Sequence, residues 1–299
     1  MQRSNAASFR FPKRTPLPKC CADDQSQSLP ATSPALRSFT PTNKYSAMRL
    51  FGLIGYPLGH SFSKQYFSEK FAREGISDAR YELFPLPDVA DLPQLLRQHP
   101  DLCGLNVTIP HKQTVMPYLH DLDDTAQAVG AVNCIRVREG RLRGFNTDVT
   151  GFEQSLRALW GGSQKRALIL GTGGASKAVA WVLGRMGIPH QFVSRQPRVE
   201  AGARAKETQI GYEDIGLLSP HEYQMVVNTT PLGTYPKTDA CPPFPFEWLR
   251  PEHLVYDLIY NPPETLLLRR AAERGCTVKN GLEMLHLQAE RAWEIFDAE

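Results

Sequence analysis

Three short polar clusters interrupt apolar or small-residue runs in the middle of the chain. The first is Asn106-Val-Thr-Ile-Pro-His-Lys112, the second is the Asn133 that ends Gly-Ala-Val-Asn, and the third is the Asp148 that ends Phe-Asn-Thr-Asp. A soluble fold has no structural need for amides, a lysine and a carboxylate at such points, because these groups are costly to bury without partners. The clusters therefore predict one site for a polyhydroxylated substrate.

Each cluster taken alone also has an ordinary structural interpretation. An isolated lysine such as Lys112 is a solvated surface charge in roughly nine cases in ten, and Asp148 fits a first-turn acid that the helix dipole favours. Ser61 and Ser63 lie between an expected strand and an expected helix, where a serine more often caps the helix. Their hydroxyls could instead join the free helix N–H groups in holding a carboxylate. These separate interpretations are hard to keep together in one chain.

A glycine-rich turn occupies the position that a dinucleotide-binding loop requires. Gly171-Thr-Gly-Gly-Ala-Ser176 follows an apolar strand at 166–170 and precedes a helix that runs to about Met186. Free N–H groups at such a helix start attract a diphosphate. The sixth position is serine rather than Gly or Ala, and a lone match of this kind has roughly even odds of being a plain turn. The next strand, 190–194, completes a βαβ unit of about 30 residues and makes the match more specific.

The end of that second strand distinguishes NAD from NADP. NAD sites usually place an Asp or Glu there to bind the ribose 2′-hydroxyl. Here the strand ends Ser194-Arg195-Gln-Pro-Arg198, without a carboxylate. Ser194 can hydrogen-bond a 2′-phosphate, and both arginines can pair with it. NADP is therefore the favoured cofactor. The alternative, that both arginines are solvated side chains on a loop, has a chance of roughly one in four.

Apolar periodicity from Leu50 onward predicts alternating strands and helices. Strands are expected at 50–54, 81–84 and 102–107, and 131–145 is expected to form a hairpin around Glu139-Gly140. A helix is expected with Phe67 and Phe71 on one face, and Pro110 suits the first position of the next helix. This half is α/β with a mostly parallel sheet. Beyond it we expect a helix at 147–160, strands at 225–228 and 254–257, and a last helix at 282–296.

Charge and hydropathy exclude two classes of partner. Residues 1–47 hold seven Lys and Arg against two acids and therefore carry a charge of +5. Since the whole chain has a net charge of +3, the remaining residues sum to −2. A near-neutral body carries no footprint for nucleic acid. The chain also lacks an apolar run of about 20 residues that would span a membrane. The expected partner is a small-molecule substrate, and monomer and homodimer both remain open.

Six cysteines in 299 residues are too few for a disulfide scaffold. Cys103, Cys134, Cys241 and Cys276 are expected to be reduced, partly buried thiols, which favours the cytoplasm. No His lies at ligand spacing from the adjacent Cys20 and Cys21, so no metal is expected.

Residues 1–47 are serine- and proline-rich and lack apolar periodicity, which predicts a disordered extension. A targeting segment, a natural linker and a wrongly assigned start all fit, and Met48 is favoured as the true start.

Seven motifs occur in the order in which the shikimate dehydrogenase family carries them. That family has His-Ser-x-Ser, Asn-Val-Thr-[Val/Ile]-Pro-x-Lys, Gly-Ala-Val-Asn, Asn-Thr-Asp, Gly-x-Gly-Gly-Ala-[Ser/Ala], Asn-[Ala/Thr]-Thr, and Gly-Leu-x-Met-Leu with a Gln beyond. The corresponding segments here are 60–63, 106–112, 130–133, 146–148, 171–176, 228–230 and 281–285, with Gln288. The chain thus resembles this family over nearly all of residues 50–296.

The resemblance implies NADP-dependent interconversion of 3-dehydroshikimate and shikimate, with Lys112 and Asp148 as the catalytic pair. The substrate-binding residues that it implies are Ser61 and Ser63 on the carboxylate, and Asn106, Thr108, Asn133, Tyr260 and Gln288 around the ring. The cofactor-binding residues that it implies are Gly171, Gly173, Gly174, Ala175, Ser194, Arg195, Arg198, Thr229 and Gly281. It further implies a substrate domain at 48–147, completed by the C-terminal helix 282–299, and a Rossmann-type NADP domain at 148–281.

The implied reaction gives the lysine and the aspartate distinct tasks. Reducing a ketone requires a hydride on carbon and a proton for the developing alkoxide. Lys112 is the nearby group that can stabilise that oxygen and deliver a proton, and Asp148 can orient the lysine and the hydroxyls. An ordinary lysine pKa of about 10.4 suits a stabilising cation better than a base. Which of the two is the formal acid stays open.

Three departures from the family and three rival functions complete the sequence-based picture. After Ser63 the family usually has Pro and, shortly beyond, a His, whereas residues 64–67 are Lys-Gln-Tyr-Phe here. Ser194-Arg195-Gln196 replaces the family's Asn-Arg-Thr but keeps the arginine, and Glu283 stands near the expected nicotinamide where many members have Gly. The rivals are a quinate/shikimate dehydrogenase of broader range, a catalytically silent NADP or cyclitol sensor, and a folate dehydrogenase. The sensor does not need both Lys112 and Asp148, and the folate enzyme does not explain the paired serines.

Overall fold

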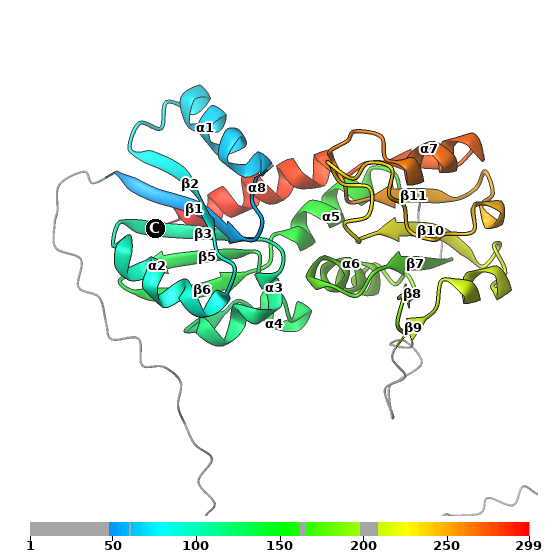
Figure 1. Ribbon diagram of the computed structural model, residues 1–299, viewed down its shortest axis with the longest axis horizontal. Helices are drawn as coiled ribbons and strands as arrows, with labels where there is room; N and C mark the ends of the chain where they lie inside the picture. Colours follow the sequence, from blue (N-terminus) through cyan, green and yellow to red (C-terminus); the bar gives the residue numbers. More distant parts are fainter. Residues whose placement is uncertain (1–47, 60, 162–164, 198–208, 299) are drawn as a thin grey trace, which may run out of the picture. The chain divides into compact units, whose positions relative to one another are not determined.

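The computed structural model describes residues 48–59, 61–161, 165–197 and 209–298, which form two six-stranded sheets with helices packed on them (Figure 1). The first sheet contains β1 (Arg49–Gly55), β2 (Ala79–Pro85), β3 (Leu102–Val107), β4 (Asp121–Leu122), β5 (Cys134–Arg138) and β6 (Arg141–Phe145). The second contains β7 (Arg166–Leu170), β8 (His190–Val193), β9 (Gln209–Ile210), β10 (Tyr223–Asn228), β11 (Leu254–Asp257) and β12 (Thr277–Lys279).

The helices alternate with these strands along the chain, as expected of an α/β protein. They are α1 (Phe62–Glu74), α2 (Leu92–Gln98), α3 (His111–Thr114), α4 (Asp124–Val129), α5 (Asp148–Arg157), α6 (Gly174–Arg185), α7 (Leu266–Glu273) and α8 (Leu282–Asp297). Short 3-10 helices lie at η1 (Val89–Asp91), η2 (Met116–Tyr118), η3 (Glu213–Leu217) and η4 (Phe246–Trp248). The expected α/β fold class is confirmed.

The first sheet has the strand order β2-β1-β3-β5-β6-β4 and is mixed. Three of its five pairings are parallel, and β5 is antiparallel to both β3 and β6. The hairpin between β5 and β6 turns at Glu139 (φ 48°) and Gly140 (φ 72°). Positive φ at both central residues is typical of a type I′ turn, so the predicted hairpin is confirmed. Its first strand begins at Cys134 rather than Ala131, because Val132 N–H donates to the carbonyl of Lys112 instead.

The C-terminal helix α8 returns to pack on this first sheet. The ring of Phe51 in β1 lies 5.3 Å from that of Trp293 and 5.2 Å from that of Phe296. A Cβ built on Gly104 in β3 would lie 2.4 Å from the Phe296 ring, so only glycine admits the helix there. Phe67 and Phe71 of α1 are buried in the same core, as their spacing predicts.

The second sheet is parallel throughout, with the order β9-β8-β7-β10-β11-β12. The chain moves outward from β7 to β9 on one side, then returns to the centre and moves outward from β10 to β12. This is the strand order of the dinucleotide-binding fold, and it reverses between β7 and β10. Ligands of such sheets bind outside the carboxyl ends of the strands at this point of reversal.

Two helices end or begin differently from the sequence-based expectation. Pro110 caps α3 rather than occupying its first turn, and α3 itself is one turn long. Pro117 disfavours helical geometry in Met116 and provides no N–H for a continuing helix, so the chain changes to η2. Helix α5 spans 148–157 rather than 147–160, since Thr147 is its N-cap residue. The disorder expected for residues 1–47 lies outside the described residues.

The described cysteines are free thiols, as expected. Cys134 and Cys276 are buried, and Cys103 and Cys241 are partly buried. Burial raises the pKa of all four thiols, which keeps them protonated and unreactive. Among the helices that the structure describes, none combines the length and the apolar character needed to cross a membrane.

Candidate active site

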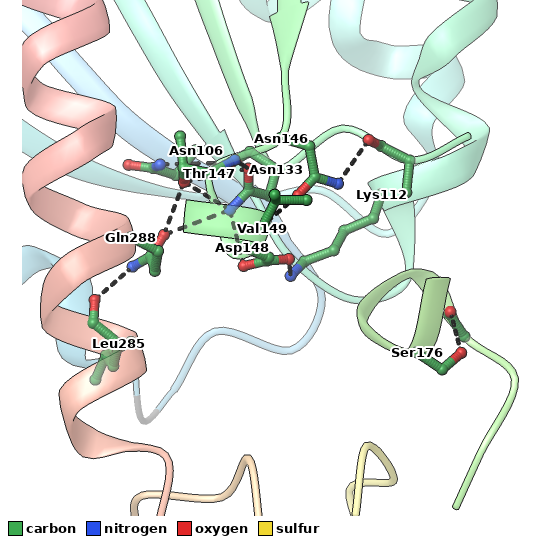
Figure 2. Close-up of polar contacts among 12 residues, drawn as sticks. Asn106, Lys112, Asn133, Asn146, Thr147, Asp148, Val149, Ser176, Leu285 and Gln288 are labelled. Atoms are coloured by element: carbon green, nitrogen blue, oxygen red, sulfur yellow. Dashed lines mark hydrogen bonds and ion pairs between the residues drawn. The ribbon is translucent and has the colours of Figure 1, made fainter. Parts of the chain in front are cut away.

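Lys112 and Asp148 form an ion pair in the structure (Figure 2). The ammonium lies 2.6 Å from Oδ2 of the carboxylate, and the two side chains are 17% and 7% exposed. Lys112 belongs to the single turn of α3, which follows β3, and Asp148 is the first residue of α5. A carboxylate in the first turn of a helix is stabilised by the N–H groups and the dipole there. The expected pair is therefore assembled from two separate polar clusters.

Asn133 holds the other side of the same carboxylate. Its side-chain amide donates to Oδ1 of Asp148 and to Oγ1 of Thr147, at 2.9 Å in each case. Its amide oxygen accepts from the backbone N–H of Thr147 at 2.6 Å. Both oxygens of Asp148 thus have a fixed donor, one from Lys112 and one from Asn133. Such a carboxylate has little freedom to rotate, which suits an orienting role.

Gln288 reaches this cluster from α8. Its Oε1 lies 3.4 Å from both the hydroxyl of Thr147 and the side-chain amide of Asn133, and its Nε2 donates to the carbonyl of Leu285 at 2.9 Å. Helices α5 and α8 run alongside each other (Figure 1). They approach closely because Gly151 has no side chain: a Cβ there would lie 2.6 Å from the carbonyl oxygen of Met284.

Asn106, at the end of β3, is held by a tyrosine that the sequence did not single out. The hydroxyl of Tyr81 in β2 donates to Oδ1 of Asn106 at 2.8 Å and also bonds the side chain of Ser63. Burial raises the pKa of Tyr81 well above its usual value, so the hydroxyl stays a donor at neutral pH. The ring stacks on Phe67 at 4.5 Å. In sequence the residue fits the apolar face of a strand, and nothing there shows that its hydroxyl points toward the amide.

Three of the remaining substrate-site candidates, Ser61, Ser63 and Tyr260, lie at the start of α1. Ser61 is its N-cap residue and accepts from the N–H of Ser63 at 3.3 Å, as the capping interpretation predicts. Tyr260 stands beside it: its hydroxyl receives the N–H of Phe62, and the two rings are 5.9 Å apart. Thr108 follows β3 and is partly exposed. His60 of the same motif lies outside the described residues.

The glycine turn lies at the point where the second sheet reverses its order. Gly171 has φ +107°, and a Cβ on it would lie 2.8 Å from the hydroxyl oxygen of Thr229, so both its conformation and its space require glycine. That hydroxyl donates to the carbonyl of Leu170 at 2.7 Å and joins the ends of β7 and β10. Gly173 is the N-cap residue of α6, and Gly174 and Ala175 begin the helix.

Ser176, the sixth residue of that turn, is compatible with the fold although the general fingerprint has Gly or Ala there. Its side chain is buried, and its hydroxyl donates to the carbonyl of Gly173 at 2.6 Å. The hydrogen bond of this hydroxyl is therefore made within the loop. It lies at a separate place from the Lys112–Asp148 ion pair (Figure 2). The free N–H groups at the start of α6 remain suited to a diphosphate.

Ser194 and Arg195 lie at the end of β8, where a 2′-phosphate is expected. Ser194 accepts from the N–H of Gln196 at 3.2 Å, and Arg195 is exposed. Arg198 lies outside the described residues. Gly281, which caps α8, donates its N–H to the carbonyl of Ile259 at 3.0 Å. A Cβ on it would lie 2.0 Å from the carbonyl oxygen of Leu258, so its glycine serves close packing in this structure.

Glu283, the acid expected near the nicotinamide, is exposed and pairs with the partly buried Lys279. The ammonium lies 2.5 Å from the carboxylate, four residues along the chain. The charge of Glu283 is thus compensated locally.

A parallel sheet with a glycine turn at its point of reversal, together with a partly buried lysine–carboxylate pair, defines a nucleotide-dependent oxidoreductase of the Rossmann class. The family model described as "Shikimate dehydrogenase substrate binding domain" matches residues 53–135. The chain is 36% identical over 270 residues to the shikimate dehydrogenase (NADP(+)) of Desulforamulus reducens, with 82% of this chain and 88% of the relative covered. It therefore belongs to the shikimate dehydrogenase family, as its motifs predict.

Solved structures agree with this assignment. Shikimate dehydrogenase 1 from Peptoclostridium difficile superposes with a TM-score of 0.75 at 33% identity, covering 83% of this chain and 92% of that one. Shikimate 5-dehydrogenase from Thermus thermophilus, solved with NADP(H) and shikimate, gives 0.73 at 32% identity, covering 84% and 94%.

Proposed function

We propose that this protein is an NADP-dependent shikimate dehydrogenase that interconverts 3-dehydroshikimate and shikimate during aromatic amino acid biosynthesis. The observation that carries the proposal is the meeting of Lys112, Asp148 and Asn133 from three separate segments, with both carboxylate oxygens occupied. A protein that only bound a cyclitol would not need a cation and a carboxylate in contact. The names of the relatives and the ligands of the Thermus thermophilus structure support the same substrate and cofactor.

The chain's own residues bind and orient the substrate. In this proposal Ser61 and Ser63 hold the carboxylate, and the amides and hydroxyls around the ion pair hold the ring hydroxyls. These are Asn106, Thr108, Asn133, Tyr260 and Gln288. Most of them already have protein partners, so the pocket is preorganised and loses little side-chain freedom when substrate binds.

The proton is moved by the ion pair. When bound, NADPH supplies the hydride that adds to the carbonyl carbon. As the oxygen becomes an alkoxide, the Lys112–Asp148 pair stabilises it and gives it the proton that completes the hydroxyl. In the reverse direction the hydroxyl proton passes to the pair as the hydride leaves. The direct contact between the ammonium and the carboxylate suits this exchange.

The two sheets divide these tasks. We assign substrate binding to residues 48–147 with α8, and NADP binding to residues 148–281, with a cleft between them. The residues that would hold NADP are the turn Gly171–Ser176, Thr229, and Ser194 with Arg195. The open space beside Gly173, where an added Cβ would meet nothing within 4 Å, fits a closely approaching diphosphate. We expect a cytoplasmic monomer or homodimer.

The decisive experiment is an assay of the purified protein for NADPH formation from shikimate and NADP, followed by absorbance. Quinate and NAD are tested in parallel at matched concentrations. We expect the highest kcat/KM with shikimate and NADP. Comparable efficiency with quinate and NAD would identify the broader enzyme instead. Binding of NADP without turnover of either acid would identify a sensor.

A further inference from the structure

Gly174, the first residue of α6, faces Lys112 so closely that an added side chain would meet it. A Cβ built on Gly174 would lie 2.9 Å from Cβ of Lys112, 3.4 Å from its Cδ and 3.6 Å from Cβ of Ala131. The first distance is shorter than non-bonded carbons tolerate. Relief would require movement of the backbone, because the position of a Cβ is fixed by its own main chain. The absence of a side chain at Gly174 thus sets how closely α6 approaches α3.

The dinucleotide fold itself does not call for this glycine. Its fingerprint requires glycine at the positions of Gly171 and Gly173 and a small residue at that of Ser176, whereas Gly174 occupies a position that the fingerprint leaves free. Gly174 is helical and is not among the glycines with positive φ. Its backbone therefore accepts alanine without strain, and alanine is the better helix former. The N–H that Gly174 offers to a diphosphate at the start of α6 would be kept by alanine, so NADP binding does not require glycine at this position. The proximity to Lys112 is what remains to explain the glycine.

The surroundings of Lys112 would transmit such a displacement to the site. The Lys112 carbonyl accepts from Val132 N–H at 2.7 Å, and the neighbouring Ala131 carbonyl accepts from the side chain of Asn146 at 2.8 Å. Ala131 is buried in the same core as Ala178 and Val179 of α6. A close-packed core of this kind cannot yield at one point alone.

We propose that Gly174 is a positioning residue for catalysis: by lacking a side chain, it allows Lys112 to reach Asp148 in the geometry needed for proton transfer. The inference rests on the proposed function of Lys112. It adds to the backbone role of Gly174 in the cofactor turn a second role in turnover, which comes from its missing side chain and does not act through NADP affinity. A misplacement of about 1 Å can lower a catalytic rate by about 100-fold.

Three Gly→Ala variants separate this role from the alternatives. Gly174→Ala is expected to lower kcat by about 10- to 100-fold, with the Kd for NADP, measured by calorimetry, within about threefold of the native value. Gly173→Ala, whose Cβ would meet no protein atom within 4 Å, is expected to weaken NADP binding. Gly184→Ala, in the same helix and equally open, is the control and should leave kcat and Kd unchanged.

A double-mutant cycle tests whether the effect passes through the lysine. Lys112→Ala keeps the Cβ that clashes but removes the ammonium. Gly174→Ala should therefore lower kcat in the native background and leave it unchanged in the Lys112→Ala background. A loss of NADP affinity with native kcat in Gly174→Ala would overturn the inference. An equal further loss of kcat in both backgrounds would overturn it too.

Stability measurements keep the inference testable without turnover. The Tm of Gly174→Ala should fall below that of Gly184→Ala. Lys112→Gly removes the clashing side-chain atoms, so in proteins that also carry Lys112→Gly the two Gly→Ala changes should give the same Tm. If Gly174→Ala does not fold, the variant that also carries Lys112→Gly should fold and bind NADP. Failure of that double variant to fold would contradict the steric argument. A native protein that does not oxidise shikimate would defeat the proposed function, and the Tm comparison would still decide whether the contact exists.

Discussion

Asn133 and Lys112 bind opposite oxygens of Asp148, at 2.9 and 2.6 Å. The aspartate is therefore fixed on both sides before any substrate arrives, and the lysine is directed by a carboxylate that does not need to rotate. Such preorganisation lowers the reorganisation needed when charge develops on the substrate oxygen.

Replacing Lys112 with alanine should lower kcat by about 10²- to 10⁴-fold with a smaller change in the KM for shikimate, because the ammonium matters most as the alkoxide forms. Asp148→Asn should lower kcat as well. If the pair acts as one unit, the double variant will be far less impaired than the product of the two single effects. Steady-state kinetics of the three variants measure this. Near-native kcat with lost substrate affinity in Lys112→Ala would show that the lysine only binds.

Replacing Tyr81 with phenylalanine removes one hydroxyl between Ser63 and Asn106 and keeps the ring that stacks on Phe67. Loss of a buried hydrogen bond costs about 1 to 3 kcal/mol. We expect a lower free energy of unfolding and a KM for shikimate raised by about 3- to 10-fold, within the range of one weakened hydrogen bond, with kcat less affected. Urea unfolding and kinetics measure the two effects. An unchanged KM would mean that Asn106 keeps its orientation without the tyrosine.

The polar clusters and the strand-turn-helix could be identified from the sequence because each is local. Asn106 to Lys112 and Gly171 to Ser176 carry their chemistry within seven residues or fewer. The role of Tyr81 could not be identified from the sequence. Its hydroxyl meets the Asn106 amide, 25 residues away, only after β2 and β3 have both paired with β1. The approach of Gln288 depends likewise on the missing side chain of Gly151, which is a property of helix packing and not of periodicity.

The two serines show how a correct local interpretation can leave a functional one open. Ser61 caps α1 in the structure, as an ordinary N-cap serine would. Capping uses its oxygen as an acceptor, and a substrate carboxylate would need the hydroxyl as a donor. Since one hydroxyl can do both, the capping bond is compatible with either role.

Arg195 should control the choice of cofactor. Arg195→Ala is expected to raise the KM for NADP by roughly 10- to 150-fold, which corresponds to a lost charge-assisted contact of about 1.5 to 3 kcal/mol, and to leave the KM for NAD nearly unchanged. The preference for NADP should also weaken at high salt, since the side chain is exposed. The neighbouring Gln196→Ala is the matched control. Equal kcat/KM of the native protein with NADP and NAD would contradict the assignment.

Asp257 should make stability depend on pH. Burial raises its pKa to about 6, although Thr265, the N–H of Ile259 and Asn228 all donate to the carboxylate and oppose the rise. The folded protein therefore holds a proton on this group between about pH 4 and 6, where the unfolded chain has lost it. This contribution to the free energy of unfolding is most favourable below about pH 4 and is lost as pH rises through 6.

Asp257→Asn removes that titration while keeping an acceptor at Oδ1 and an amide that can donate to the Thr265 hydroxyl. A pKa of about 6 in the fold, against about 3.9 in the unfolded chain, corresponds to about 3 kcal/mol. The difference in unfolding free energy between native protein and variant should therefore move in favour of the native protein, by up to about 3 kcal/mol, as pH falls from 7 to 4. Urea unfolding at several pH values measures this difference, in which the other titrating groups cancel. A difference that stays constant over this range would show that the carboxylate is ionised in the fold at all of these pH values.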